Sequence, residues 1–77
     1  MKRDKLLRRI LAKADNVRFG ELVALAEAYG FRLARVSGSH HIFKHPDKDE
    51  LLNLQNYKGK AKPYQIRQFL RLIGESI

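Results

Sequence analysis

Histidine is the residue of this chain best suited to proton transfer, and His40 has the most favourable neighbours. It follows Gly38 and Ser39, which predict a tight turn at the start of a β-strand. Glycine lacks a Cβ, so a phosphate can approach the backbone there, and exposed N–H groups of a turn can bind an anion. Ser39 adds a hydroxyl. An imidazole, with an ordinary pKa of about 6.5, gives or takes a proton near neutrality.

This segment therefore predicts acid/base chemistry on a nucleic-acid backbone through His40. RNA is favoured because its 2′-OH, beside the scissile phosphate, is an internal nucleophile that DNA lacks. General acid/base catalysis of this kind accelerates a reaction roughly 10²–10⁴-fold. The alternative is a bystander, since a histidine at a surface turn is more often inert.

A metal site built from His40, His41 and His45 is not expected. Adjacent residues of a strand point to opposite faces, so His40 and His41 diverge. His41 and His45 share a face but lie roughly 13 Å apart at ~3.3 Å per residue, whereas zinc needs ligands at about 2 Å. We therefore predict no metal and no small-molecule cofactor, and structural roles for His41 and His45. Phe43 is either a core residue or a base-stacking platform.

Basic residues near the end of the chain are candidates for binding a phosphate backbone. Lys58, Lys60 and Lys62 lie in a predicted loop with Gly59 at its centre, immediately before a predicted helix. Ammonium groups and a helix N-terminus both attract phosphates. Such contacts position a nucleic acid without reading its sequence. Arg67 extends this basic track, and Lys44 adds a charge on the strand of His40.

The composition favours a polyanionic partner. Sixteen Lys and Arg against eight Asp and Glu give a net charge of +8 on only 77 residues, which favours nucleic acid first, then an acidic protein, then an anionic membrane. A solvated basic surface without a dedicated partner is the alternative. The chain has no cysteine, and no apolar run approaches the roughly 20 residues of a membrane span. We expect a complete, cytoplasmic protein with one domain over residues 1–77.

Apolar residues at helical spacing predict three helices. The first covers residues 3–14, and Asp15 or Asn16 can cap the second. The second ends at Gly30, where a left-handed residue would terminate it. The third begins at Pro63, whose missing N–H costs nothing in a first turn. The stripes are Leu6, Leu7, Ile10, Leu11 and Ala14; Phe19, Leu22, Val23, Ala26 and Tyr29; and Ile66, Phe69, Leu70 and Ile73.

Between the second and third helices the pattern predicts three short strands, over residues 31–36, 40–45 and 51–55. Residues 37–39 and 46–49 form the predicted turns, and residues 57–62 the lysine-rich loop. Consecutive short strands favour an antiparallel meander with helices on one face. The expected fold class is therefore α+β, with a three-stranded antiparallel sheet and the order ααβββα.

Four segments of the chain share a family pattern: Gly38-Ser39-His40-His41-Ile42-Phe43, Leu52-Asn53-Leu54-Gln55, Lys58-Gly59-Lys60-Ala61-Lys62-Pro63-Tyr64 and Ile66-Arg67-Gln68-Phe69-Leu70. With these segments the chain resembles the HicA family of bacterial toxins, small mRNA interferases of type II toxin–antitoxin systems. The resemblance covers about residues 17–74, a family core preceded by an additional helix over 3–14. It implies a double-stranded-RNA-binding-like fold, metal-independent endoribonuclease activity on mRNA, and neutralisation by a HicB-type antitoxin. The family's catalytic histidine falls on His40, and its turn on Gly38 and Ser39.

The chain departs from the family pattern in one respect that concerns the chemistry. Many members carry another histidine after the third strand, in a Pro-x-His stretch, where this chain has Gln55, Asn56 and Tyr57. The role of that histidine is vacant here or passes to Tyr57 or a lysine. A non-catalytic RNA-binding module with the same basic surface is the main alternative function. An interaction protein whose positive face docks an acidic partner is a third.

Overall fold

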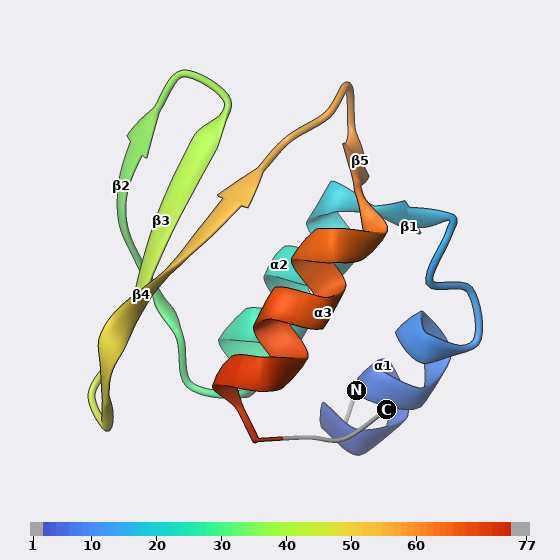
Figure 1. The fold of residues 1–77 in the computed structure, drawn as a ribbon, viewed down its shortest axis with the longest axis horizontal. Helices are drawn as coiled ribbons and strands as arrows, with labels where there is room; N and C mark the ends of the chain where they lie inside the picture. Colours follow the sequence, from blue (N-terminus) through green and yellow to red (C-terminus); the bar gives the residue numbers. More distant parts are fainter. Residues whose placement is uncertain (1–2, 75–77) are drawn as a thin grey trace.

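The computed structural model describes residues 3–74, over which the predicted α+β class and the order ααβββα are confirmed (Figure 1). The structure adds two short strands, β1 and β5, to that order. No helix among the described residues is long and apolar enough to cross a membrane. The elements are α1 (Arg3–Leu11), β1 (Val17–Arg18), α2 (Phe19–Ala28), β2 (Arg32–Ser37), β3 (His40–His45), β4 (Lys48–Gln55), β5 (Lys60–Ala61) and α3 (Pro63–Leu72).

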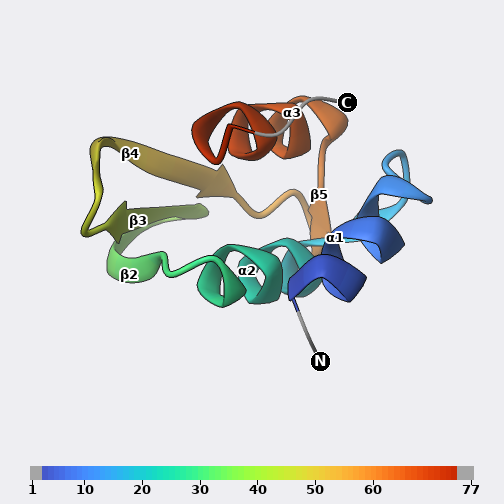
Figure 2. The ribbon, with the colours of Figure 1, turned by 90° about the horizontal axis from the view of Figure 1, so that it is seen from below.

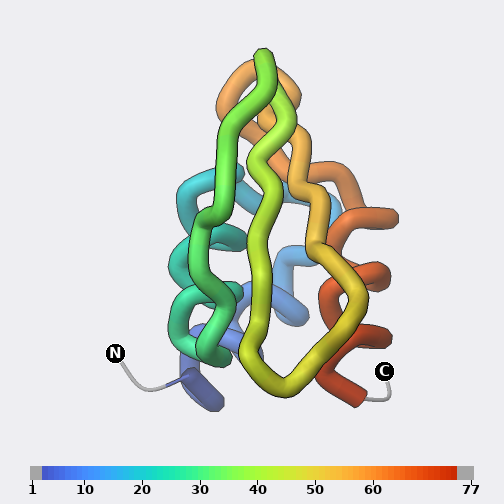
Figure 3. Tube along the Cα trace, turned by 90° about the vertical axis from the view of Figure 1, so that its left-hand side faces the viewer, coloured from blue at the N-terminus to red at the C-terminus, as the bar shows by residue number. Residues whose placement is uncertain are grey.

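The main sheet is antiparallel, with β3 between β2 and β4. Figure 3 shows this sheet in front and the helices behind it, with α2 behind β2 and α3 behind β4. One face of the sheet is therefore covered and the other is open, as predicted. Figure 2 shows α1 farther from the sheet, where it packs against α2.

The side of β3 that faces the helices is fixed by Phe43. This residue is 1% exposed and pairs with Leu52, which is 0% exposed. Because side chains alternate along a strand, His41 lies on the same side, while His40 and Ile42 lie on the open face. Phe43 is thus a core residue and is not available to stack on a base. The core consists of Ile10, Val17, Phe19, Leu22, Leu25, Ala26, Phe31, Phe43, Leu52, Leu54, Ala61, Ile66, Phe69 and Leu70.

The turn before His40 is shorter than predicted. Ser37 pairs with His40 in the ladder, so only Gly38 and Ser39 form the turn. Gly38 has φ +59° and Ser39 a negative φ, the pattern of a type II′ turn, which favours glycine at its first central position. The next turn is likewise reduced to residues 46–47, because Lys48 pairs with His45.

The start of the chain differs from the prediction in two respects. α1 ends at Leu11, because residues 12–15 form turns. Asp15 and Asn16 do not cap α2, whose N-cap is Arg18. Val17 is 1% exposed and pairs with Ala61, so the chain is extended up to Arg18 and the helix cannot begin earlier. The Arg18 N–H then donates to Glu21 Oε1 at 3.0 Å, which satisfies one free donor of the first turn.

The predicted loop over residues 57–62 is instead a hairpin that continues into β5. Tyr57 and Lys60 exchange both backbone hydrogen bonds, each 3.0 Å long. Lys58 has φ +52° and Gly59 φ +87°, and a type I′ turn requires positive φ at both central residues. β5 then pairs with β1, with Arg18 opposite Lys60. This two-stranded sheet attaches the N-terminal segment to the hairpin.

A glutamine side chain joins the helix layer to the edge of the sheet. Gln65 of α3 is 1% exposed. Its Oε1 accepts the Gln55 N–H at 2.7 Å, and its Nε2 donates to the Gln55 carbonyl at 3.0 Å. The primary amide therefore satisfies both backbone groups at the end of β4, as a neighbouring strand would. Gln55 pairs on its other side with His40, so this contact also supports the strand that carries His40.

We predict that Gln65→Ala lowers the free energy of unfolding by about 1–3 kcal/mol, because it leaves buried backbone groups without partners. Urea denaturation measures this loss. The matched control is Gln68→Ala in the same helix, where no such pairing exists and a change within about 0.5 kcal/mol is expected. Equal effects of the two substitutions would contradict the structural role of Gln65.

Candidate functional site

His40 is the first residue of β3 and is exposed on the open face of the sheet. Its Nδ1 lies 3.1 Å from Asn53 Oδ1. A carbonyl oxygen only accepts hydrogen bonds, so Nδ1 is the donor. In the neutral ring the proton is therefore on Nδ1, and the Nε2 lone pair is available to accept one. The contact orients His40 as a general base.

Asn53 was not among the residues predicted from the sequence. It lies on β4 opposite Ile42, and hence on the same open face as His40, one diagonal step away. The signal for it was the strand register, because antiparallel strands with alternating side chains place residues 40, 42 and 53 on one face. That register depends on the exact lengths of the turns, which the sequence pattern did not give.

The turn before His40 is held by contacts to the end of β4. The Asn56 N–H donates to the Ser39 carbonyl at 2.9 Å, and Gln55 Nε2 donates to Ser39 Oγ at 3.3 Å. The Ser39 hydroxyl proton is thus left to bond a ligand. A Cβ built on Gly38 would have no neighbour within 4 Å, so the space beside the turn is open. Gly38, Ser39 and His40 are therefore brought together at an accessible and fixed turn.

The contacts of His41 are structural. Its ring packs against Phe19, with 4.8 Å between centroids. Its Nδ1 donates to the Ser39 carbonyl at 3.3 Å. His41 thus helps to hold the turn that directly precedes His40.

His45 connects the other end of β3 to the end of α2. The Asp47 N–H donates to its Nδ1 at 3.0 Å, so Nε2 carries the proton and donates to the Tyr29 carbonyl at 2.9 Å. A Cβ on Gly30, which has φ +95°, would lie 2.9 Å from that Nε2, so His45 needs glycine there. Among residues 3–74, no three His, Asp or Glu side chains gather as metal ligands.

The three lysines near the hairpin do not form one row. Lys58 and Lys60 line a pocket with residues from the start of the chain. Lys62 lies over the Tyr57 ring, with Nζ 4.6 Å from the centroid. The hairpin and the turn before His40 lie at the same end of the molecule, at the top of Figure 1.

The two remaining basic candidates lie apart from this end. Lys44 is exposed on the open face of β3, roughly 13 Å along the strand from His40 at ~3.3 Å per residue. Arg67 is exposed on α3, which packs behind the sheet rather than on its open face. The structure does not bring Arg67 to the His40 side.

Tyr57, which the sequence offers as a replacement for a second histidine, makes a different contact. Its hydroxyl lies 2.8 Å from that of Tyr64. This hydrogen bond, with a smaller contribution from desolvation, raises the pKa of Tyr64 above its ordinary value. The Tyr64 hydroxyl therefore loses its proton only at a pH above the ordinary range of a tyrosine. The residue that the structure places against His40 is Asn53, not Tyr57.

Taken together, these features define a small, strongly basic α+β domain with an oriented, exposed histidine at a glycine–serine turn. Residues 19–75 match the family model of the HicA toxin of bacterial toxin–antitoxin systems, and the chain belongs to this family. The resemblance noted in the sequence is thereby confirmed, and membership implies an antitoxin partner. The match begins at the first residue of α2, so α1 and β1 lie outside it. A search of curated proteins gave no significant match.

We predict that Tyr57→Phe lowers the pKa of Tyr64 towards its ordinary value of about 10, since it removes the hydrogen bond that raises it. NMR titration of the tyrosine ring signals between pH 8 and 12 measures this shift. A raised pKa in the folded state stabilises the fold below pH about 10, and this contribution is lost as the pH rises through the folded-state pKa. An unchanged titration of Tyr64 in the variant would show that the hydrogen bond from Tyr57 is not the cause of the raised pKa.

Proposed function

We propose that this protein is an endoribonuclease toxin that cleaves mRNA in the cytoplasm, without a metal ion, through His40. The observation that carries the proposal is the His40–Asn53 hydrogen bond, which leaves Nε2 as a free base on the open face. The family match supports a toxin role. The net charge of +8 supports a polyanionic substrate.

In the proposed reaction, His40 Nε2 accepts the proton of a ribose 2′-OH. The 2′ oxygen then attacks the adjacent phosphorus, the bond from phosphorus to the 5′ oxygen breaks, and this leaving oxygen takes a proton from water. The products are a 2′,3′-cyclic phosphate and a free 5′-OH. The Ser39 hydroxyl and the backbone beside Gly38 bind the phosphate oxygens. No other ionisable side chain is needed for this scheme, which accounts for the absence of a second histidine at residues 55–57.

Lysines hold the rest of the RNA in this proposal. Lys58, Lys60 and Lys62 bind backbone phosphates at the end of the molecule that carries the turn, and Lys44 extends the contact along the open face. Arg67 adds positive charge from α3. These contacts neutralise phosphates without reading bases, so cleavage is expected to depend weakly on sequence. A HicB-type antitoxin then neutralises the toxin by covering the face that bears His40.

We predict that His40→Ala slows RNA cleavage by at least ~10²-fold, the usual contribution of a general base, and abolishes growth inhibition. The assay contains EDTA, which should leave the wild-type rate unchanged. An RNA with a single 2′-deoxy nucleotide at the cleaved position should resist cleavage, because it lacks the nucleophile. Circular dichroism is expected to show an intact fold, since the His40 side chain is exposed.

Cleavage by His40→Ala at nearly the wild-type rate would refute the catalytic assignment. Tight, salt-dependent RNA binding without any cleavage by the wild type would instead establish a non-catalytic RNA-binding module. Strong inhibition by EDTA would point to a metal-dependent reaction.

Asn53 is proposed as a positioning residue, because its side chain hydrogen-bonds His40 Nδ1 and acts on the reaction through that imidazole. We predict that Asn53→Ala lowers kcat about tenfold with little change in KM, since the imidazole loses its orientation. Asn53→Asp keeps an acceptor for Nδ1–H and should restore the rate. It should also move the acid side of the pH–rate profile to higher pH, because a carboxylate stabilises imidazolium. A merely structural role for Asn53 would give neither the rescue nor the shift.

A further inference from the structure

The pocket lined by Lys58 and Lys60 lies beside the hairpin, and half of its lining comes from outside the family match. It has a volume of about 580 Å³. α1 and β1 precede residue 19, where the HicA match begins. The pocket therefore combines the additional N-terminal segment with the lysine-rich hairpin. Its lining residues are Lys13, Asn16, Arg18, Lys58, Gly59 and Lys60.

The pocket carries a net positive charge. Glu21 binds Lys13, with Nζ 2.9 Å from Oε1 and 2.7 Å from Oε2, and this contact is the main cause of the lowered pKa of Glu21. Lys13 is thus neutralised. Arg18, Lys58 and Lys60 have no carboxylate within ion-pair distance among residues 3–74. Lys60 donates instead to the neutral Asn16 Oδ1 at 3.1 Å, which orients its ammonium group without cancelling its charge.

The backbone of the pocket is fixed before any ligand arrives. Val17 and Ala61, both buried, pair β1 with β5, and this register places Arg18 beside Lys60. The Phe19 N–H donates to the Gly59 carbonyl at 2.8 Å. A Cβ on Gly59 would meet nothing within 4 Å, so the hairpin tip leaves open space on the pocket side. A backbone that is fixed in advance lowers the entropic cost of binding an anion.

One residue links the pocket to the turn before His40. This residue is Asn56. Its backbone N–H donates to the Ser39 carbonyl at 2.9 Å, and its side-chain Oδ1 accepts the Gly59 N–H at 2.6 Å. His40 and Gln55 are paired, with Cα atoms about 5 Å apart. Lys58 follows Gln55 by three residues, which span at most ~11 Å when the chain is fully extended. The pocket therefore lies within a few nucleotides of His40 along a bound strand.

We propose that this pocket binds a backbone phosphate of the RNA substrate, a few nucleotides from the cleaved bond. The inference rests on the proposed function for the identity of the RNA. It adds to that function a second contact point, made by Arg18 of the N-terminal segment together with Lys60 and Lys58. α1 and β1 thereby lengthen the stretch of RNA that the toxin holds.

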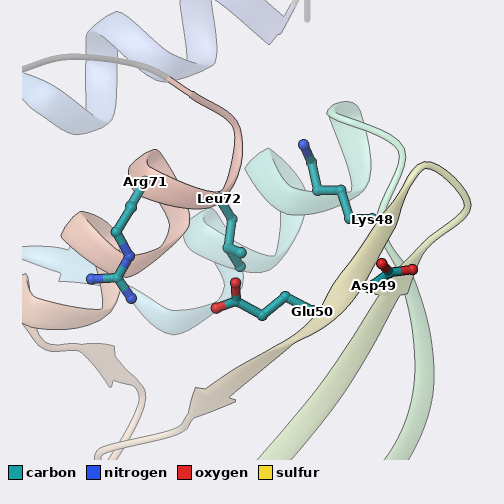
Figure 4. A pocket seen from close by; sticks show the side chains of 5 residues that line it. All are labelled: Lys48, Asp49, Glu50, Arg71 and Leu72. Atoms are coloured by element: carbon teal, nitrogen blue, oxygen red, sulfur yellow. The ribbon is translucent and has the colours of Figure 1, made fainter.

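The test compares two variants that each lose two positive charges. Arg18→Gln with Lys60→Gln changes the pocket, while Lys48→Gln with Arg71→Gln is the matched control. Figure 4 shows Lys48 and Arg71 at a separate pocket, on β4 and α3, together with the acidic residues Asp49 and Glu50. Circular dichroism checks the fold of both variants. Lys58→Asn gives a third, single-charge variant, because asparagine tolerates the positive φ of that position.

Binding is measured by fluorescence anisotropy with a 2′-O-methyl RNA, which cannot be cleaved through a 2′-OH. Each lost phosphate contact lowers the slope of log K against log salt concentration by about 0.7 for a single strand. We expect a decrease of about 0.7 for the pocket variant, because it loses one phosphate contact, a smaller decrease for Lys58→Asn, and no decrease for the control. Equal slopes for the pocket variant and the control would overturn the proposal.

Cleavage assays separate this inference from the proposed function. A dinucleotide occupies only the His40 site, so the pocket variant should slow the cleavage of a long RNA at limiting RNA roughly tenfold more than it slows the cleavage of the dinucleotide. Equal slowing on both substrates would overturn a role in holding distant phosphates. If the wild type cleaved neither RNA, the proposed function would fail, and the salt slopes alone would decide whether the pocket binds phosphate.

Discussion

The arrangement of the molecule depends on the pairing of the Gln65 side chain with the backbone of Gln55. A three-stranded sheet has two edges, and an edge strand presents unpaired N–H and C=O groups. At the end of β4 these groups face α3, at a position that is half-buried. The amide of Gln65 satisfies both of them and joins α3 to the edge of the sheet. His40 pairs with the opposite side of the same residue, so the candidate site lies beside a strand position that α3 holds directly.

The elements that could be predicted from the sequence are those whose burial follows a local period. The stripe that includes Leu22 and Ala26 predicted α2, and Ile66 and Phe69 predicted α3. β1 and β5 could not be found this way, because strands of two residues have no period. The positive φ of Lys58 is equally invisible, since lysine has no preference for that conformation.

The candidate site was predictable only in part, for a related reason. His40 could be selected from its neighbours in sequence, Gly38 and Ser39, and the structure places all three at one turn. Its hydrogen-bond partner Asn53 lies thirteen positions away. Choosing Asn53 requires the register of β3 against β4, and that register is decided by turns of two residues. The partner of His40 is therefore determined by long-range strand pairing, which local sequence propensity does not predict.

The brevity of the turn before His40 makes chain length part of the chemistry. Side chains of a strand alternate, so a single residue inserted between Ser37 and His40 that shifted β3 by one position would exchange its two faces. His41 would then stand on the open face, and His40 would be turned towards Phe19 and the core. Two adjacent histidines would have exchanged environments without either being substituted. For relatives of this protein, an alignment that tolerates a gap in this hairpin therefore risks assigning the reactive imidazole to the wrong histidine.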